Sequence, residues 1–363
     1  MARFAGHLFL GCLLAVTLAA PPARVRAADV PGPMADLQAK LAVASTHAPG
    51  HIALEVEDLA TGYGTAINAD ASMPAASTIK IPVMVEVFRQ MAAGTFGLRD
   101  VLHVQSSDRD DGWGDLADAP RGTARTVDQL LRLMIEESDN TATNMLIRLV
   151  GRTRINATMS ELGLSRTRVG DYIRSEGDIR SLRSSPHDMT RLLEAMAQAR
   201  LIDEWSSREM LAILTGQRHN GLIPAPLPKG MAIAHKTGTL HDTLNDVGIV
   251  YLRDEPYVIA VMTTHLPSLS DGRVFIRHVS SLAFTAFERF ARWRENEGLP
   301  AFDGIAGSSQ LLPGADQPLA PDVQMWTPQE QAPATTPQAP PDQPDAPAPA
   351  ATATPAGETG AGG

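Results

Sequence analysis

The segment ASTIK over residues 76–80 contains a serine and a lysine with the types and spacing of a nucleophile and its base. A serine hydroxyl is a weak nucleophile until an adjacent base takes its proton, and a lysine whose charge is disfavoured by burial can serve. Ser77 and Lys80 share one face of the helix that we expect over 76–93, and its N-terminus would favour an oxyanion. A solvated surface pair is the alternative, but Lys80 is one of only four lysines and lies between two isoleucines.

A second polar motif, Ser138-Asp139-Asn140, separates two apolar stretches that we expect to be helical, 126–136 and 140–150. One interpretation is structural, because serine, aspartate and asparagine favour helix N-caps and polar turns. The other is chemical: the serine hydroxyl relays a proton and the asparagine amide holds a substrate.

A third motif, HKTGT over 235–239, follows the apolar run 232–234, which indicates a strand that ends near the lysine. One interpretation is an edge strand that carries a single lysine. The other places Lys236 and Thr237 against an anionic group of a substrate, while Gly238 lets the substrate backbone come close.

Together, the three motifs in this order resemble those of the β-lactamase and penicillin-binding protein superfamily, and of the class A-like serine hydrolases most closely. The likeness extends from about residue 50 to about residue 295. It implies that Ser77 is acylated, that Lys80 is its base and that Ser138 passes a proton to the leaving nitrogen. It also implies substrate-binding roles for Asn140, Lys236, Thr237, Gly238 and Thr239, with the backbone N–H groups of Ser77 and Thr239 forming the oxyanion hole.

One part of the family pattern is missing from segment 164–186. Class A β-lactamases hydrolyse the acyl-enzyme with a loop glutamate that is followed by an asparagine, but this segment contains no asparagine. Its acids are Asp171, Glu176 and Asp178, of which Glu176 is the candidate replacement for the deacylation acid. The alternative is that all three acids pair with arginines of the same loop. The sequence therefore supports acylation better than rapid deacylation.

The hydrophobic pattern predicts the elements that position these motifs. Alternation over 51–58 is typical of a half-buried strand, with a hairpin partner over 64–68 and two further strands over 244–252 and 257–264. Helical patterns cover 34–47, 126–136, 140–150, 153–162, 186–199 and 272–294. We therefore expect an α/β (α+β) fold, an antiparallel sheet flanked by helices with an inserted all-helical lobe, and a site in the cleft between them. Trp113 is expected to pack in the lobe, with a place in the cleft as the alternative.

Both ends of the chain differ from its middle. Residues 1–27 have a basic start and an apolar run of 13 residues, which predicts a signal peptide and a secreted or periplasmic protein without stable membrane insertion after cleavage; a membrane anchor is the alternative. Cys12, the only cysteine, lies within this segment, where lipidation is conceivable. Residues 306–363 are rich in proline and alanine, which predicts a disordered tail. The hydrolase domain is thus expected over 28–305.

Composition narrows the function further. A net charge of −10 argues against a nucleic-acid binder, and the ten histidines show no metal-ligand spacing, so His235 and His241 are expected to be local hydrogen-bond partners. We expect a monomer that needs no cofactor and no metal and acts on a β-lactam or peptidoglycan-like small substrate. The leading hypothesis is an exported serine hydrolase that opens β-lactam amides through a Ser77 acyl-enzyme. A D-Ala-D-Ala peptidase or esterase, and a β-lactam or cell-wall sensor without turnover, are the alternatives.

Overall fold

The computed structural model describes residues 30–175, 181–252 and 255–305. The expected signal peptide with Cys12, the loop acids Glu176 and Asp178, and the proline-rich tail lie outside these residues. Within the described ranges, no helix combines the length and the apolar character needed to cross a membrane.

The main sheet has five antiparallel strands in the order β2-β1-β10-β9-β8. Its strands are β1 (His51–Asp58), β2 (Gly64–Ile67), β8 (Ile233–Thr239), β9 (Leu244–Leu252) and β10 (Glu255–Thr264). The first strand pairs along its whole length with the last, from His51 opposite Thr264 to Asp58 opposite Tyr257. The predicted sheet, assembled from both ends of the folded region, is therefore confirmed.

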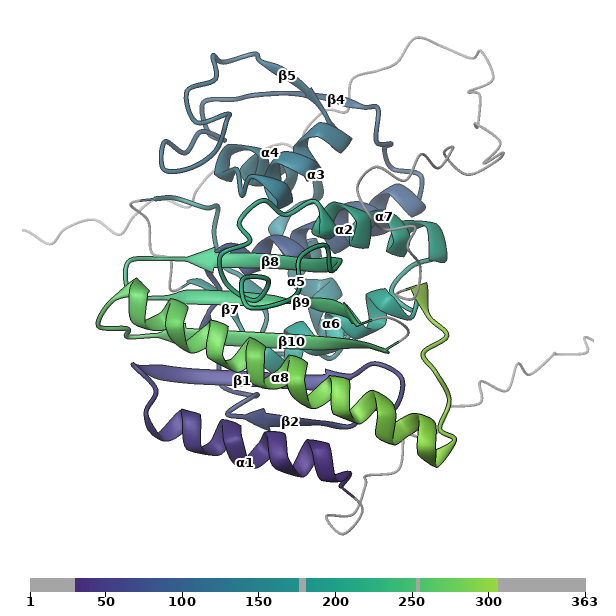
Figure 1. The fold of residues 1–363 in the computed structure, drawn as a ribbon. Coiled ribbons are helices and arrows are strands. Elements are labelled where there is room, and N and C mark those ends of the chain that lie inside the picture. The colour runs from purple at the N-terminus through teal and green to yellow at the C-terminus, as the bar shows by residue number, and fades with distance from the viewer. Residues whose placement is uncertain (1–29, 176–180, 253–254, 306–363) are drawn as a thin grey trace, which may run out of the picture. The chain divides into compact units, whose positions relative to one another are not determined.

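Helices cover both faces of this sheet. On one face lie α1 (Gly32–Thr46) and α8 (Leu269–Glu297), as Figure 1 shows. Strand β10 is buried at every position, because alternate side chains point to opposite layers. Tyr257 packs with the α1 and α8 side, where its ring stacks on Phe287 at 4.3 Å, whereas the neighbouring Val258 belongs to the core of the helical lobe.

Strand β1 is present as predicted, but the expectation that it is half-buried is wrong. Its polar face is covered by α6 (Pro186–Ala197), and the acids on that face find partners there. A Glu55 carboxylate oxygen lies 3.1 Å from His187 Nδ1, and Glu57 forms an ion pair with Arg191. The alternating polarity of β1 therefore comes from acids that pair with residues of a covering helix. It does not indicate a face that is exposed to water.

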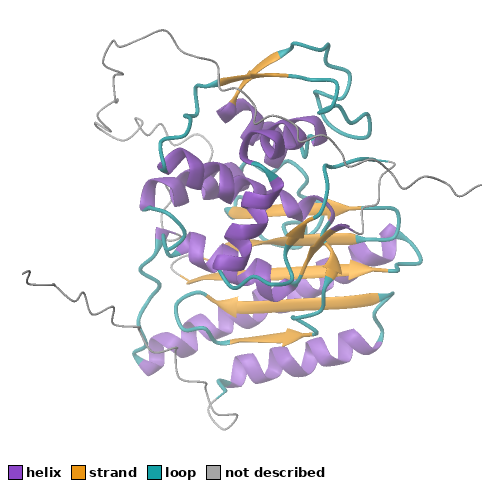
Figure 2. Ribbon diagram, turned by 180° about the vertical axis from the view of Figure 1, so that it is seen from behind, coloured by secondary structure: helices purple, strands orange, loops and turns teal. Residues whose placement is uncertain are grey.

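The helical lobe lies between β2 and β8 in the chain and is seen from behind in Figure 2. Besides α6, its helices are α2 (Lys80–Ala92), α3 (Val127–Glu136), α4 (Asn140–Val150), α5 (Arg152–Glu161) and α7 (Glu204–Thr215). Short strands complete it: β3 (Met73–Pro74), β6 (Arg168–Val169) and β7 (Leu182–Ser184) form one small sheet, and β4 (Val101–His103) and β5 (Ala124–Thr126) form a hairpin. All predicted helices are present, and α7 is an additional helix that the sequence analysis did not assign.

Candidate active site

Ser77 lies on a tight turn that the rest of the fold holds in place. It belongs to the 3₁₀ turn η2 (Ala76–Ile79), so α2 begins at Lys80 and not at residue 76 as expected. The preceding residue, Ala76, has a positive φ of 49°, a conformation that a residue with a Cβ adopts only under constraint. The Asn245 side chain of β9 supplies part of that constraint by donating to the carbonyls of Pro74 and Ala75, at 2.9 and 3.1 Å.

Lys80 joins the first motif to the second. Its ammonium group is fully buried and donates to the Ser138 carbonyl at 2.7 Å, to Ser138 Oγ at 3.1 Å and to Asn140 Oδ1 at 2.8 Å. Burial and the neighbouring Lys236 lower the pKa of Lys80 well below its usual value, and Asp139 and Asp110 oppose that shift. The surroundings of the first motif therefore disfavour the charged form of its lysine.

Lys236 brings the third motif to the same hydroxyl. Its Nζ donates to Ser138 Oγ at 3.0 Å and to the Thr237 carbonyl at 3.0 Å. Burial lowers the pKa of Lys236 to about 7, although the charge of Asp246 acts in the opposite direction. The expected end of the strand near the lysine is wrong: β8 continues to Thr239 and forms the edge of the main sheet, so the motif lies inside the strand.

The second motif fits both interpretations offered for it. Asp139 is the N-cap of α4, where one carboxylate oxygen accepts from the Ala142 N–H and the other from the Leu116 N–H, both at 2.7 Å. Ser138 has a positive φ of 62°, and its hydroxyl lies between the two lysines. The cap thus fixes the turn that presents the hydroxyl and the amide.

Gly238 is required by a close approach within the protein itself. A Cβ built on it would lie 2.9 Å from the Ala75 carbonyl oxygen and 3.1 Å from the Ser77 backbone nitrogen. The sequence analysis assigned this glycine to the approach of a substrate, whereas the structure shows that it lets β8 pack against the turn that carries Ser77.

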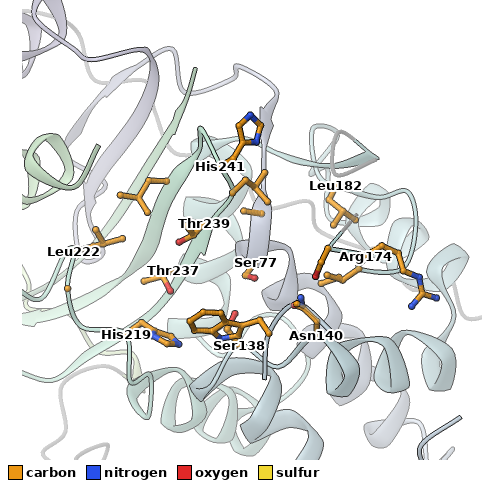
Figure 3. Close-up of a pocket in the computed structure, with 18 of the residues that line it drawn as sticks. Ser77, Ser138, Asn140, Arg174, Leu182, His219, Leu222, Thr237, Thr239 and His241 are labelled. Atoms are coloured by element: carbon orange, nitrogen blue, oxygen red, sulfur yellow. The ribbon is translucent and has the colours of Figure 1, made fainter. Parts of the chain in front are cut away.

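These residues surround one cavity of about 600 Å³, shown in Figure 3. The predicted site residues that line it are Ser77, Ser138, Asn140, Thr237 and Thr239. Both lysines are buried beneath it, and Gly238 lies between Thr237 and Thr239 in β8. The fold therefore brings all eight of the motif residues predicted for acylation and binding to one place.

Comparison with known proteins shows which family this arrangement represents. Residues 36–287 match the Beta-lactamase enzyme family, and the match covers more than half of the chain. The chain belongs to this family. The predicted resemblance and fold class are thereby confirmed, and the family and fold support a serine β-lactam hydrolase at the family level.

Solved structures of this family agree with the fold. A β-lactamase from Sphaerobacter thermophilus DSM 20745 is 30% identical, with 70% of this chain and 97% of that chain covered and a TM-score of 0.65. PBP-A is also 30% identical, with 70% and 96% covered and a TM-score of 0.66. A mutant of PBP-A, solved as an acyl-enzyme complex with penicillin G, gives 30% identity, 70% and 97% coverage and a TM-score of 0.66.

The rim of the cavity in this β-lactamase-family chain carries aromatic side chains that the motifs do not include. Trp113 lines the cavity and is 55% exposed, so the expectation that it packs in the lobe is wrong. Its indole Nε1 donates to the Glu137 carbonyl at 2.9 Å, and its ring lies 5.7 Å from that of His219, which the sequence analysis missed. The two rings come from segments far apart in the chain and together form part of the cavity wall.

The two histidines considered in the sequence analysis, His235 and His241, have different surroundings. His235 is buried, with Asp246 Oδ1 2.9 Å from its Nδ1 and Asn220 Oδ1 2.9 Å from its Nε2, which confirms it as a local hydrogen-bond partner. His241 lines the cavity with an exposed ring. Throughout the described ranges, no three His, Cys, Asp or Glu side chains are grouped so as to hold a metal ion.

The described part of segment 164–186, where the resemblance led us to look for a deacylation acid, reaches the cavity. Its residues Ile173, Arg174 and Ser175 line the cavity, and Asn144 holds Ile173 through both backbone groups, at 2.8 and 2.9 Å. Glu176, the candidate replacement acid, lies outside the described residues. Among the described residues, Asp171 forms an ion pair with Arg152 of α5 at 3.3 Å, which lies outside its own loop.

Proposed function

We propose that this protein is a serine hydrolase that opens β-lactam amides through an acyl-enzyme on Ser77. The observation that carries the proposal is the convergence of two buried lysines, Lys80 and Lys236, on Ser138 Oγ at 3.1 and 3.0 Å, in a cavity that Ser77 lines. Two ammonium groups close together in a buried site disfavour each other's charged form, which supports Lys80 as a neutral base.

In the proposed acylation, Ser77 Oγ attacks the lactam carbonyl carbon while its proton passes to Lys80 Nζ. The backbone N–H groups of Ser77 and Thr239 stabilise the oxyanion of the tetrahedral intermediate, and the contact at Gly238 supports this role because it brings β8 against the Ser77 backbone. When the lactam C–N bond breaks, Ser138 gives its hydroxyl proton to the nitrogen and receives the proton held by Lys80. Each group thus returns to its starting protonation state, apart from the ester on Ser77.

The remaining motif residues bind the substrate in this proposal. Lys236 in its charged form and the Thr237 hydroxyl hold the carboxylate of the β-lactam. Asn140 holds the amide of the acyl side chain through its side-chain amide. The proposal also includes export of the protein, which is supported only by the composition of residues 1–27.

A second candidate, a D-Ala-D-Ala peptidase, is favoured by a different observation. Ile173, an aliphatic residue, lines the cavity from the loop on which class A β-lactamases carry the deacylation glutamate. An acyl-enzyme without a nearby base for water is long-lived, as expected of an enzyme inhibited by β-lactams or of a sensor.

A time course of intact-protein mass with a small penicillin tests the proposal. An adduct that forms and disappears while penicillin is consumed supports a β-lactamase. An adduct that forms and persists excludes rapid turnover; hydrolysis of a D-Ala-D-Ala peptide then identifies a peptidase, and no hydrolysis leaves a sensor. Ser77→Ala should abolish the adduct, whereas Ser106→Ala, at an exposed serine of the lobe, should leave it unchanged. An adduct on Ser77→Ala would refute the nucleophile assignment.

A further inference from the structure

Asp110 is a buried acid beside the cavity that the mechanism above does not use. It is only 5% exposed, and its carboxylate accepts four hydrogen bonds. Oδ1 accepts from Asn140 Nδ2 at 2.9 Å, Ser175 Oγ at 2.7 Å and the Gly112 N–H at 3.1 Å, and Oδ2 accepts from the Ser175 N–H at 2.6 Å. One carboxylate thus touches a substrate-binding residue of the second motif and the loop at the cavity edge.

The charge state of Asp110 determines which end of the Asn140 side-chain amide, the NH₂ or the carbonyl, faces the carboxylate. Burial raises the pKa of Asp110, but hydrogen bonds from Asn140 and Ser175 outweigh that effect and hold it below its usual value. An ionised carboxylate only accepts hydrogen bonds, so the amide group of Asn140 that faces it must be the NH₂. The carbonyl of that amide then faces Lys80 Nζ, at 2.8 Å.

Lys80 by itself would not fix this orientation. A charged ammonium group only donates, but a neutral amine also accepts, and the proposed mechanism needs Lys80 neutral when Ser77 attacks. Either side of an amide can face a neutral amine, whereas only the NH₂ can face the Asp110 carboxylate. Asp110 therefore holds the amide of Asn140 in one orientation while the proton moves, and leaves the second N–H of that NH₂ for a substrate carbonyl.

The same carboxylate takes part in a set of hydrogen bonds that connect segments 107–110 and 173–175. Arg174 donates to the Ser107 and Arg109 carbonyls at 2.7 and 2.9 Å. Asn144 Nδ2 donates to the carbonyls of Asp108 and Ile173, at 3.0 and 2.9 Å. Among these contacts, the Asp110 side chain is the one that also reaches Asn140, so it connects the position of the loop to that of a site residue.

We propose that Asp110 is a positioning residue that orients the side-chain amide of Asn140 and seats Ser175 of the cavity loop against it. This inference rests on the proposed function, because it concerns the role of Asn140 during acylation of Ser77.

Asp110→Asn tests the inference, with Asp111→Asn as the matched control. The second substitution removes the same charge from the neighbouring residue, which is exposed. Losing a buried charged partner should slow acylation by penicillin about 10- to 100-fold in Asp110→Asn, whereas Asp111→Asn should stay within about 2-fold of the wild type. Equal rates for the two variants would overturn the proposal.

A double-mutant cycle separates positioning from general damage. If Asp110 acts through Asn140, then Asp110→Asn should slow acylation by less than about 3-fold when Asn140 is already replaced by alanine. The same factor in both backgrounds would contradict a role through Asn140. Ser175→Ala removes one donor to Asp110 and leaves Asn140 its partner, so it should slow acylation less than Asp110→Asn does; equal slowing by the two variants would contradict a role through Asn140.

The pH profile of acylation adds a readout that structural damage would not move. The charged groups that act on Lys80 are Lys236 of β8, Asp139 at the start of α4 and Asp110. Removing the Asp110 charge lowers the pKa of Lys80 further, so the acid limb of the profile should move to lower pH in Asp110→Asn and stay in place in Asp111→Asn. An unmoved limb would count against the proposal. A wild-type protein without any adduct would refute the proposed function instead, so the two failures are distinguishable.

Discussion

The two walls of the cavity differ in the side chains that they present. One wall, formed by η2, the start of α4 and β8, contains two buried lysines, Lys80 and Lys236, which both donate to Ser138 Oγ. The other wall is the loop segment 173–175, and it presents an isoleucine, an arginine and a serine. Among the described residues that line the cavity, none is an aspartate or a glutamate.

In the proposed mechanism, acylation depends on the first wall and deacylation on the second. The motif wall depends on side-chain identity, because each of its contacts is made by a functional group. The loop wall is held partly through its backbone, because Asn144 binds the N–H and the carbonyl of Ile173, and partly through the side chains of Arg174 and Ser175. The two Asn144 bonds do not depend on which side chain stands at position 173, so in the proposed mechanism we expect a substitution there to alter deacylation and to leave the motif contacts in place.

The largest expected effect is on the motif wall. Lys80→Met removes the base but keeps a side chain of similar length, so acylation by penicillin should slow by about 10³-fold, in the range of lost general-base catalysis. Intact-protein mass spectrometry of samples quenched at successive times measures the rate of acylation. Lys40→Met, at an exposed position of α1, is the control and should leave the rate unchanged. A normal rate in Lys80→Met would show that another group takes the Ser77 proton.

A smaller effect is expected from giving the loop wall a carboxylate. In Ile173→Glu, burial would raise the pKa of the new acid toward neutrality, which suits a base for the hydrolytic water. The half-life of the penicillin adduct should shorten by about 10- to 100-fold relative to Ile173→Gln, which has the same size without the base. If both variants decay alike, the loop side chain does not face the acyl bond, and the comparison of the two walls fails.

The smallest effect concerns pH and substrate affinity. The pKa of Lys236 is lowered to about 7, so its charge is present below that pH and is lost above it. Apparent affinity for a carboxylate-bearing penicillin should therefore weaken above about pH 7, by at most about 10-fold per pH unit. Measuring acylation over a series of penicillin concentrations on both sides of this pH would test the prediction. Lys236→Met should give an affinity that is low and independent of pH, and a parallel decline in that variant would assign the effect to another group.

Local signals in the sequence were sufficient for most of the fold. The strands over 51–58 and 244–252 and the helices around the motifs follow from hydrophobic period, turn residues and caps, which act over a few residues. Helix α7 also had such signals, since Asp203 caps it and Leu211 and Leu214 are buried, but they were not used. The half-buried interpretation of β1 failed because alternation records side-chain polarity and not what covers each face.

What the sequence by itself determined is the order and type of the motif residues, and from these the family and the residues that we propose for acylation. Only the tertiary structure decided which other side chains join them. Asp110 lies 30 residues from Asn140 and 65 from Ser175, within an acidic segment that is typical of a solvated loop. Trp113 is held at the cavity by a hydrogen bond from its indole Nε1 to the carbonyl of Glu137, which is 24 residues away in the chain. Charge, burial and orientation of such groups depend on contacts between distant segments, and no local pattern encodes them.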